Sequence, residues 1–191
     1  MENIRQILEE NKVILKGHFL LSSGLHSDTY FEKYRLLEKP YLIGEIIKTK
    51  ENVIRSLGIT LCIGPLTGGA LVAFAVGRML KVKAFYMEKA GEDLLLKRDF
   101  LIGKDDRILL CDDVMTTGGS FKKMIKCLGP DATKIHGFFV LIDRSVASCE
   151  EIVPLISIYK THAATYEPEN CPLCKQGVPL EKRGSSPTPR L

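Results

Sequence analysis

The chain has 191 residues, of which 45% are apolar and 26% are charged, values close to the averages of soluble globular domains. The length fits one domain, or one domain with a small appendage, and the composition excludes a disordered or collagen-like protein. Lys and Arg number 27 against 23 Asp and Glu, which leaves a formal charge of +4. This excess is too small and too dispersed to predict a nucleic-acid partner, but it suits an anionic small substrate.

The N-terminal sequence lacks the basic segment and following apolar stretch of a signal peptide, so we expect a cytoplasmic protein. Residues 56–77 carry no charged side chain, and this is the length of a membrane-spanning helix. Glycines and a proline within this stretch divide it into a strand, a tight loop and a helix, however. No membrane partner is therefore predicted.

In chain order, the spacing of apolar residues first predicts an amphipathic helix within residues 2–15. A strand-like patch at 18–21 and a polar turn at 22–28 follow. Together they predict a small N-terminal hood over residues 1–39.

From residue 40 onward, helical and strand-like segments alternate. The expected helices cover residues 40–57, 68–80 and 118–128, and the expected strands cover 60–64, 83–87, 107–111, 134–142 and 154–160. The stretch between 88 and 104 is ambiguous. Almost continuously apolar strands are typical of sheets covered by helices on both faces. The pattern predicts an α/β fold with a doubly wound, mostly parallel sheet.

These boundaries predict a single domain over residues 1–165, with the core at 40–165. The C-terminal tail at 166–191 contains five prolines and is expected to fray.

The motif that carries most chemical information runs from Ile108 to Ser120. An apolar strand ends there in Asp112 and Asp113, and a loop rich in hydroxyl groups and glycine leads into a helix. Ligands of open α/β sheets bind beyond the carboxyl ends of the strands, where this loop falls. Its hydroxyls, its backbone N–H groups and the positive end of the helix would form a phosphate cradle. The pattern matches neither a Walker loop nor a dinucleotide fingerprint.

Because two carboxylates beside a phosphate cradle would repel a phosphate alone, they favour a hydroxyl-rich or cationic partner. A ribose 5-phosphate fits, since its hydroxyls would donate to Asp112 and Asp113. The alternative is a solvated turn in which an aspartate caps the next helix.

This motif resembles the phosphoribosyl pyrophosphate (PRPP) signature of the type I phosphoribosyltransferases, which pyrophosphokinases and non-catalytic regulators share. Phe19 to Phe31 resembles the hood signature of the orotate phosphoribosyltransferase family, and Gly64 to Ala70 resembles its pyrophosphate-binding loop. Leu141 to Arg144 resembles its strand-end arginine, which meets the orotate carboxylate. The resemblance covers about residues 15–159.

The resemblance implies a Mg²⁺-dependent pentosyltransferase that forms orotidine 5′-monophosphate and pyrophosphate from orotate and PRPP, in the de novo biosynthesis of UMP. It also implies a homodimer. Two alternatives stay open: a phosphoribosyltransferase for another base, or a PRPP-sensing regulator. The hood segment and Arg144 argue against the first, and no helix-turn-helix or basic stripe supports the second.

The resemblance further assigns roles to single residues. Asp112, Asp113 and Lys89 would be catalytic, with the aspartates stabilising positive charge on the ribose. The residues implied to bind PRPP are Asp112, Asp113, Val114, Met115, Thr116, Thr117, Gly118, Gly119, Ser120, Lys89, Lys97 and Arg98. The implied pyrophosphate loop comprises Gly64, Pro65, Leu66, Thr67, Gly68 and Gly69. Orotate would contact Thr116, Arg144, Tyr30 and Phe31. Mg²⁺ would be held mainly by PRPP and water, with Asp112 and Asp113 as further ligands.

Several of these residues have structural alternatives. The turn at Gly64 also fits a plain connection between strand and helix. Arg144 also fits a surface arginine paired with Asp143, and Tyr30 and Phe31 also fit core packing. His26 stands where some relatives have a lysine that touches the pyrophosphate, which leaves its role open.

The largest departure from the family lies between residues 86 and 100. Family members have a mobile loop here, rich in basic residues, which reaches the pyrophosphate of the neighbouring subunit. This chain has fewer cations and four acidic residues in the stretch. The alternative is a solvated hairpin of mixed charge.

Of the six cysteines, Cys171 and Cys174 alone are paired by close spacing. Their Cys-Pro-Leu-Cys turn is half of a zinc knuckle, and four-coordinate zinc needs two more ligands. The nearest candidates, His162 and Cys149, lie at no recognised spacing, and a second chain in a dimer is another source. A zinc site and a reduced or reversibly oxidised pair both remain open. The other cysteines, Cys62, Cys111, Cys127 and Cys149, look like core residues.

Overall fold

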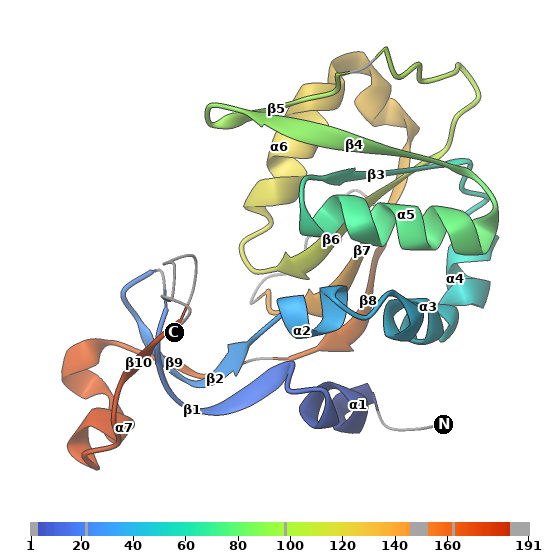
Figure 1. The fold of residues 1–191 in the computed structure, drawn as a ribbon. Helices are drawn as coiled ribbons and strands as arrows, with labels where there is room; N and C mark the ends of the chain where they lie inside the picture. Colours follow the sequence, from blue (N-terminus) through green and yellow to red (C-terminus); the bar gives the residue numbers. More distant parts are fainter. Residues whose placement is uncertain (1–3, 22, 98, 146–152, 162, 184–191) are drawn as a thin grey trace, which may run out of the picture. The chain divides into compact units, whose positions relative to one another are not determined.

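The computed structural model describes residues 4–21, 23–97, 99–145, 153–161 and 163–183 (Figure 1). The chain forms two compact units. The discontinuous unit combines Met1–Arg35 with His162–Leu191, and the continuous unit is Leu36–Thr161. The short helix α2 (Tyr34–Leu37) crosses the boundary between them.

A small four-stranded sheet organises the discontinuous unit, in the order β10-β1-β2-β9. The central strands β1 and β2 are antiparallel, β9 is antiparallel to β2, and β10 runs parallel to β1. Its elements are α1 (Ile4–Glu10), β1 (Ile14–Leu20), β2 (His26–Phe31), β9 (Thr165–Tyr166), η2 (Pro168–Asn170), α7 (Pro172–Lys175) and β10 (Glu181–Lys182).

Two predictions for this unit need correction. The N-terminal helix ends at Glu10, well before residue 15, because Lys12 has a φ of 56° and Ile14 starts a strand. The β-branched side chains of Val13 and Ile14 are buried and suit extended backbone. Residues 166–183 form short elements in place of the expected frayed tail, since β10 pairs with β1.

A six-stranded sheet in the order β5-β4-β3-β6-β7-β8 forms the centre of the continuous unit. All neighbouring strands are parallel except β4 and β5. Its strands are β3 (Leu61–Pro65), β4 (Lys83–Ala90), β5 (Asp93–Leu95), β6 (Ile108–Met115), β7 (Ile135–Asp143) and β8 (Leu155–Lys160). Its helices are α3 (Pro40–Lys48), α4 (Glu51–Ser56), α5 (Gly68–Leu80), α6 (Gly119–Leu128) and η1 (Gly129–Lys134). The α/β class with a mostly parallel sheet is confirmed.

Both faces of this sheet are apolar, which explains the continuous runs in its strands. Leu61, Leu110 and Phe138 belong to one core cluster with Phe121 and Met124 of α6. The intervening residues of the same strands are also fully buried, and alternate side chains of a strand point to opposite faces. Helix α5 packs on β3, β4 and β6 and covers the other face.

The order of the strands reverses between β3 and β6. The chain runs from β3 to β4 on one side, and then places β6, β7 and β8 successively on the other side. In open parallel sheets, a crevice for ligands forms at such a switch point, outside the carboxyl ends of the strands. The residues after β3 and after β6 are therefore the first place to look for a site.

Three of the predicted elements in this unit differ from the observed ones by more than one residue at an end or by division into two. The helix expected over 40–57 is two helices, α3 and α4, separated at Thr49 and Lys50. The strand expected over 83–87 continues to Ala90, and the strand expected over 107–111 continues to Met115 because it keeps its register with β7. None of the helices in the described part of the chain is long and apolar enough to span a membrane.

Candidate active site

Asp112 and Asp113 lie in the C-terminal half of β6, one of the two central strands of the six-stranded sheet, and Asp112 is in register with Val140 of β7. Both side chains are buried, with 9% and 5% of their surface exposed. The Asp113 N–H donates to Asp112 Oδ1 at 2.9 Å, and the Val114 N–H donates to Asp113 Oδ1 at 2.7 Å. These bonds to the backbone orient both carboxylates at the end of the strand.

The residue before the two aspartates, Cys111, is a core residue. Cys111 is fully buried. Burial raises the pKa of the Cys111 thiol, and the neighbouring Cys62 and Asp112 raise it further. Cys111 is an uncharged core residue, as the sequence predicts.

The loop after β6 encloses a small cavity of about 80 Å³. Gly118 has a φ of 75°, a conformation that favours glycine, and α6 begins at the next residue. The first N–H groups of a helix have no partner within the helix and carry its positive end, so they attract anions. The cavity is lined by Asp112, Val114, Met115, Thr116, Thr117, Gly118, Gly119, Ser120 and Phe121. The residues predicted to form a phosphate cradle therefore line a hollow at the N-terminus of α6.

The loop predicted to bind pyrophosphate, residues 64–69, lies directly against both aspartates. A Cβ atom on Gly68 would collide with Asp113 Oδ2, and one on Gly69 would lie 3.0 Å from Asp112 Oδ1 and 2.9 Å from the Cys111 carbonyl oxygen. The backbone of the loop after β3 therefore touches the carboxylates that end β6. The motif from Gly64 to Gly69 and the motif around Asp112, which are far apart in sequence, therefore lie against each other at the switch point.

Arg144 follows β7 at the same edge of the sheet. Its backbone N–H donates to the Met115 carbonyl oxygen at 2.8 Å, which places it beside the end of β6. The preceding Asp143 accepts hydrogen bonds from the N–H and hydroxyl of Ser145 at 2.8 and 2.6 Å. The Lys160 ammonium also lies 3.5 Å from Asp143 Oδ2.

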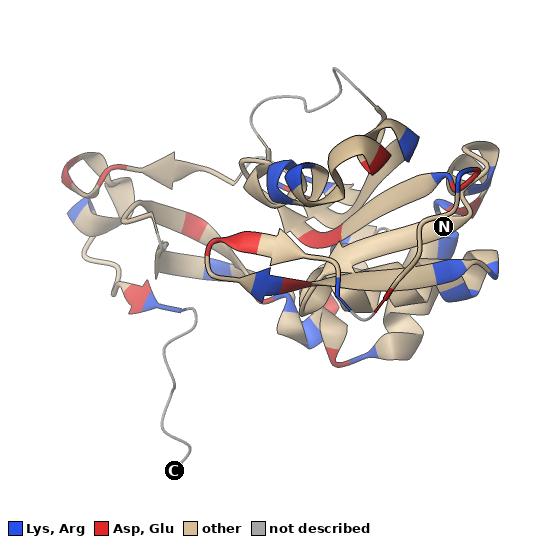
Figure 2. Cartoon of the chain, turned by 90° about the horizontal axis from the view of Figure 1, so that it is seen from above, with Lys and Arg blue, Asp and Glu red and all other residues tan. Residues whose placement is uncertain are grey.

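The ambiguous stretch after residue 87 is largely a β-hairpin of β4 and β5. It turns at Gly91, whose φ is 62°, and pairs Lys89 with Leu94. Leu94 is buried in the core cluster, and Asp93 Oδ1 accepts from Lys126 of α6 at 2.8 Å. The exposed hairpin carries charges of both signs, as Figure 2 shows for much of the chain.

The three basic residues that were predicted to contact pyrophosphate from this stretch differ in their surroundings. Lys89 is exposed on β4, and Lys97 donates to Glu88 Oε2 at 3.1 Å. Arg98 lies outside the described residues.

Three residues that the sequence linked to ligands belong to the discontinuous unit. Tyr30 lies against Phe19 with their ring centroids 5.6 Å apart, and Phe31 is buried. His26 is buried and forms a cluster with His18. Sequence reasoning missed His18, which the pattern of a short apolar strand concealed.

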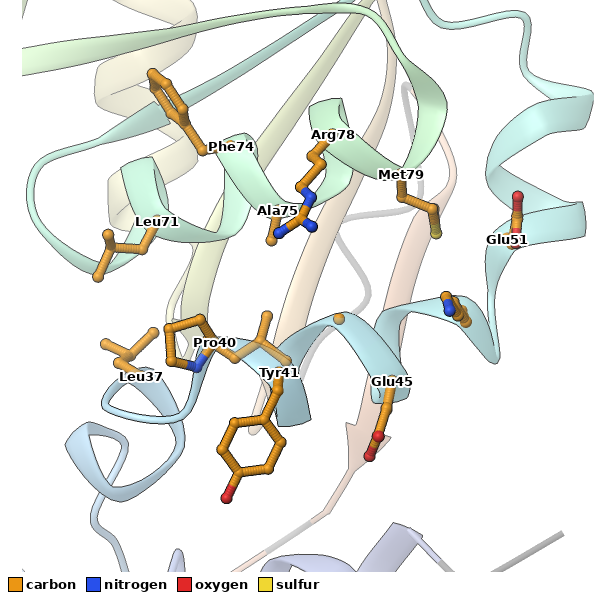
Figure 3. Close-up of a pocket in the computed structure, with 13 residues that line it drawn as sticks. Leu37, Pro40, Tyr41, Glu45, Glu51, Leu71, Phe74, Ala75, Arg78 and Met79 are labelled. Atoms are coloured by element: carbon orange, nitrogen blue, oxygen red, sulfur yellow. The ribbon is translucent and has the colours of Figure 1, made fainter.

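A groove between α3 and α5 adds a feature that the sequence did not reveal (Figure 3). It has a volume of about 760 Å³. Three large apolar side chains along it are unusually exposed: Tyr41 at 68%, Phe74 at 52% and Leu71 at 46%. Glu45, Lys48, Glu51 and Arg78 add charges of both signs to its lining.

Within the described part of the chain, two sets of side chains could hold metal ions. The carboxylates of Asp112 and Asp113 supply hard oxygen donors at the phosphate cavity, which suits Mg²⁺. His18, His26, Cys171 and Cys174 supply nitrogen and sulfur donors in the discontinuous unit.

The comparisons with known proteins agree with this geometry. The chain is 39% identical over 184 residues to the orotate phosphoribosyltransferase of Caldanaerobacter subterraneus subsp. tengcongensis, covering 96% of this chain and 97% of that protein. It is 35% identical over 182 residues to the orotate phosphoribosyltransferase of Thermotoga maritima, covering 95% and 97%. No family model matches the sequence.

Solved structures support the fold. The orotate phosphoribosyltransferase of Aeropyrum pernix matches with a TM-score of 0.62 at 24% identity, over 83% of this chain and 93% of that one. The adenine phosphoribosyltransferase of Leishmania tarentolae matches with a TM-score of 0.59 at 16% identity, over 83% and 88%. The orotate phosphoribosyltransferase relatives align over almost their whole length. The chain therefore belongs to the orotate phosphoribosyltransferase family.

Proposed function

We propose that this protein transfers the ribose 5-phosphate group of PRPP to orotate, which gives orotidine 5′-monophosphate and pyrophosphate in the de novo synthesis of UMP. One observation carries the proposal: the phosphate cavity, the aspartate pair and the second glycine-rich loop share one crevice in the continuous unit. The names of the relatives agree with it.

In this proposal, the 5-phosphate occupies the cavity at the N-terminus of α6. The hydroxyls of Thr116, Thr117 and Ser120 and the backbone N–H groups around Gly118 and Gly119 would bind its oxygens. The ribose hydroxyls would then donate to Asp112 and Asp113. As the bond to pyrophosphate breaks, positive charge develops on the ribose, and two nearby carboxylates stabilise it.

The leaving pyrophosphate would lie against the backbone of residues 64–69, where Gly68 and Gly69 allow close approach. Lys89, Lys97 and Arg98 would neutralise its charge. Arg144 would bind the orotate carboxylate through two parallel hydrogen bonds. Thr116 would add a further contact to orotate within the continuous unit, and no strong base is needed because orotate is easily deprotonated at its ring nitrogen.

Mg²⁺ is part of the proposal. Asp112 and Asp113 fit it as ligands, directly or through water, while the diphosphate and the ribose hydroxyls would contribute most of its coordination. When bound, the ion would neutralise charge on the diphosphate.

We also propose a homodimer, with the groove between α3 and α5 covered by a second copy. Its centre is apolar and exposed, as expected of an interaction surface. Its rim has both acidic and basic side chains, so a two-fold arrangement would set Glu45 or Glu51 of one copy against Lys48 or Arg78 of the other. Helix α5 starts at Gly68, so such an interface would adjoin the active site.

A substrate panel tests the function. The purified protein with PRPP and Mg²⁺ should consume orotate and leave adenine, hypoxanthine, xanthine and uracil unchanged. Turnover of a purine, or no turnover of any base by a protein that binds PRPP, would contradict the proposal. Light scattering tests the dimer: the wild type should have twice the mass of one chain, and Phe74→Glu should shift the mass toward one chain.

A further inference from the structure

Four potential metal ligands meet inside the discontinuous unit. They are His18 of β1, His26 of β2, Cys171 immediately before α7, and Cys174 within α7. One ligand atom from each lies within 4.8 Å of every other. His18, His26 and Cys171 are buried, and Cys174 is exposed. The two histidines supply the pair of ligands that the Cys-Pro-Leu-Cys turn lacked, from the same chain.

We propose that these four residues form a structural zinc site, which nothing in the transferase chemistry requires. In tetrahedral zinc sites, Zn–N bonds of about 2.0–2.1 Å and Zn–S bonds of about 2.3 Å separate two nitrogens by about 3.3 Å and a nitrogen from a sulfur by about 3.5 Å. Here His18 Nε2 lies 2.9 Å from His26 Nδ1. The sulfur of Cys171 lies 3.4 Å from His18 Nε2, and that of Cys174 lies 3.7 Å from His18 Nε2 and 3.3 Å from His26 Nδ1. These four of the six separations agree with a zinc tetrahedron to within about half an ångström, and the other two, from Cys171 Sγ to Cys174 Sγ and to His26, are at most 4.8 Å.

The second ring nitrogen of His18 supports this assignment. His18 Nδ1 lies 2.8 Å from the carbonyl oxygen of Val178, which can only accept a hydrogen bond. The proton of the neutral ring is therefore on Nδ1, and Nε2 presents its lone pair to the other three ligand atoms. Zinc-binding histidines are commonly oriented by such a bond from the nitrogen that does not bind the metal.

The backbone around the two cysteines forms a tight turn that brings both sulfurs to one side. The Lys175 N–H donates to the Cys171 carbonyl at 3.3 Å, and the Gly177 N–H donates to the Cys174 carbonyl at 3.0 Å. Gly177 has a φ of 69°, which a glycine adopts without strain. The chain then turns back and reaches Val178 and β10.

The ion would be structural because the protein supplies all four ligands and leaves no open position for a substrate. Binding would release the two thiol protons to solvent, and the two thiolates would balance the charge of Zn²⁺. The site would join the hairpin β1–β2 to the segment before β10. A unit of fewer than about 70 residues has little apolar core of its own and is of the size that often needs a metal or a disulfide.

Metal content tests the site in the full-length protein. Protein produced with added zinc and purified under reducing conditions without chelator should retain about one zinc per chain. Cys174→Ser and His26→Gln should each lower this value at least about fivefold. The matched controls Cys127→Ser and His136→Gln replace residues outside the cluster and should keep the wild-type value.

Cobalt distinguishes this site from carboxylates that bind metal at the active site. With Co²⁺ in place of zinc, the wild type should show the intense visible bands of tetrahedral cobalt and a thiolate-to-metal charge-transfer band. Asp112→Asn should keep both. If the Cys174→Ser variant fails to fold, titration of wild-type thiols with a mercurial replaces it, and one zinc should be released as two thiols react.

Three results would overturn the proposal: less than about a tenth of a zinc per chain after loading, a cobalt spectrum without the thiolate band, or a disulfide between Cys171 and Cys174 in freshly purified protein. Loss of orotate turnover with zinc retained would count against the proposed function only, so the two failures are distinguishable.

Discussion

Gly68 lies directly against the carboxylate of Asp113, so closely that a Cβ atom on the glycine would overlap Oδ2. The first residue of α5 and a residue near the end of β6 thus share one small space. The absence of a side chain at Gly68 is what lets the loop after β3 approach the end of β6 so closely.

Gly68→Ala should therefore displace the Asp113 carboxylate and lower kcat/KM for PRPP by at least about tenfold, or ~1.4 kcal/mol of transition-state stabilisation. Steady-state kinetics measure this. Gly103→Ala is the control, because a Cβ there would make an ordinary contact at 3.4 Å from Asp106 Oδ2. Full activity of Gly68→Ala would show that the loop can move away from Asp113 at no cost.

The aspartate pair should be needed for turnover more than for folding, since it lies at a strand end that lines the cavity. Asp112→Asn and Asp113→Asn should each reduce kcat at least about tenfold, while circular dichroism shows an unchanged fold. Near-normal turnover of the double variant would remove the assignment of these carboxylates to the ribose.

Arg144 is assigned to the carboxylate of orotate and not to the phosphates. Arg144→Ala should raise the KM for orotate at least about tenfold and leave the KM for PRPP nearly unchanged. Arg5→Ala, in an exposed ion pair of α1, serves as the control. Equal effects on the two KM values would reassign Arg144 to a structural role.

Subunit mixing tests whether the β4–β5 hairpin acts across a dimer. A chain with Asp112→Asn and Asp113→Asn is combined with a Lys89→Ala chain, each inactive alone, under conditions that exchange subunits. If Lys89 serves the partner's site, each hybrid has one intact site, and random pairing restores about a quarter of wild-type activity. Proven exchange without recovery would assign Lys89 to its own subunit or to no catalytic role.

Asp106 should make the stability of the continuous unit depend on pH. Its Oδ2 accepts from Lys83 Nζ and from the Gly103 N–H, both at 2.7 Å, and its Oδ1 accepts from Thr60 Oγ1 at 3.0 Å. Desolvation raises the pKa of the Asp106 carboxyl, but these hydrogen bonds outweigh it, and the pKa lies below its ordinary value.

Because the pKa is lower in the folded state, Asp106 stabilises the fold above the unfolded-state pKa of about 4 and loses this contribution as the pH falls through the folded-state pKa. Asp106→Asn should cost about 1–3 kcal/mol at pH 7 and flatten the loss of stability below about pH 4. Urea unfolding from pH 3 to 7 measures both, with the exposed Asp105→Asn as the control. An unchanged pH profile in Asp106→Asn would contradict this account.

The continuous unit was largely predictable because the sequence patterns that specify its strands and loops are local. Runs such as Ile108 to Cys111 and the glycine-rich turns at their ends indicate buried strands and phosphate loops without reference to distant residues. The end of β6 was set too early, since polar Asp112 looks like the start of a loop, whereas its backbone still pairs with β7.

The discontinuous unit was not predictable for the opposite reason. His18 and Cys171 are 153 positions apart and meet only in the folded chain, with no spacing that a sequence pattern reveals. Val13 and Ile14 continued a helical periodicity that tertiary packing overrides. The sequence also did not reveal that the side chains of Tyr41 and Phe74 are exposed, because apolar periodicity does not separate a core position from a surface groove.

The pairing of β10 with β1 has a consequence for how the protein emerges from the ribosome. Residues 36–161 are contiguous and can fold soon after they leave the exit tunnel. The first 35 residues are made earliest, yet β1 must wait for residues 181–182 to supply its parallel neighbour. The segment that is synthesised first is therefore among the last to complete its native strand pairing.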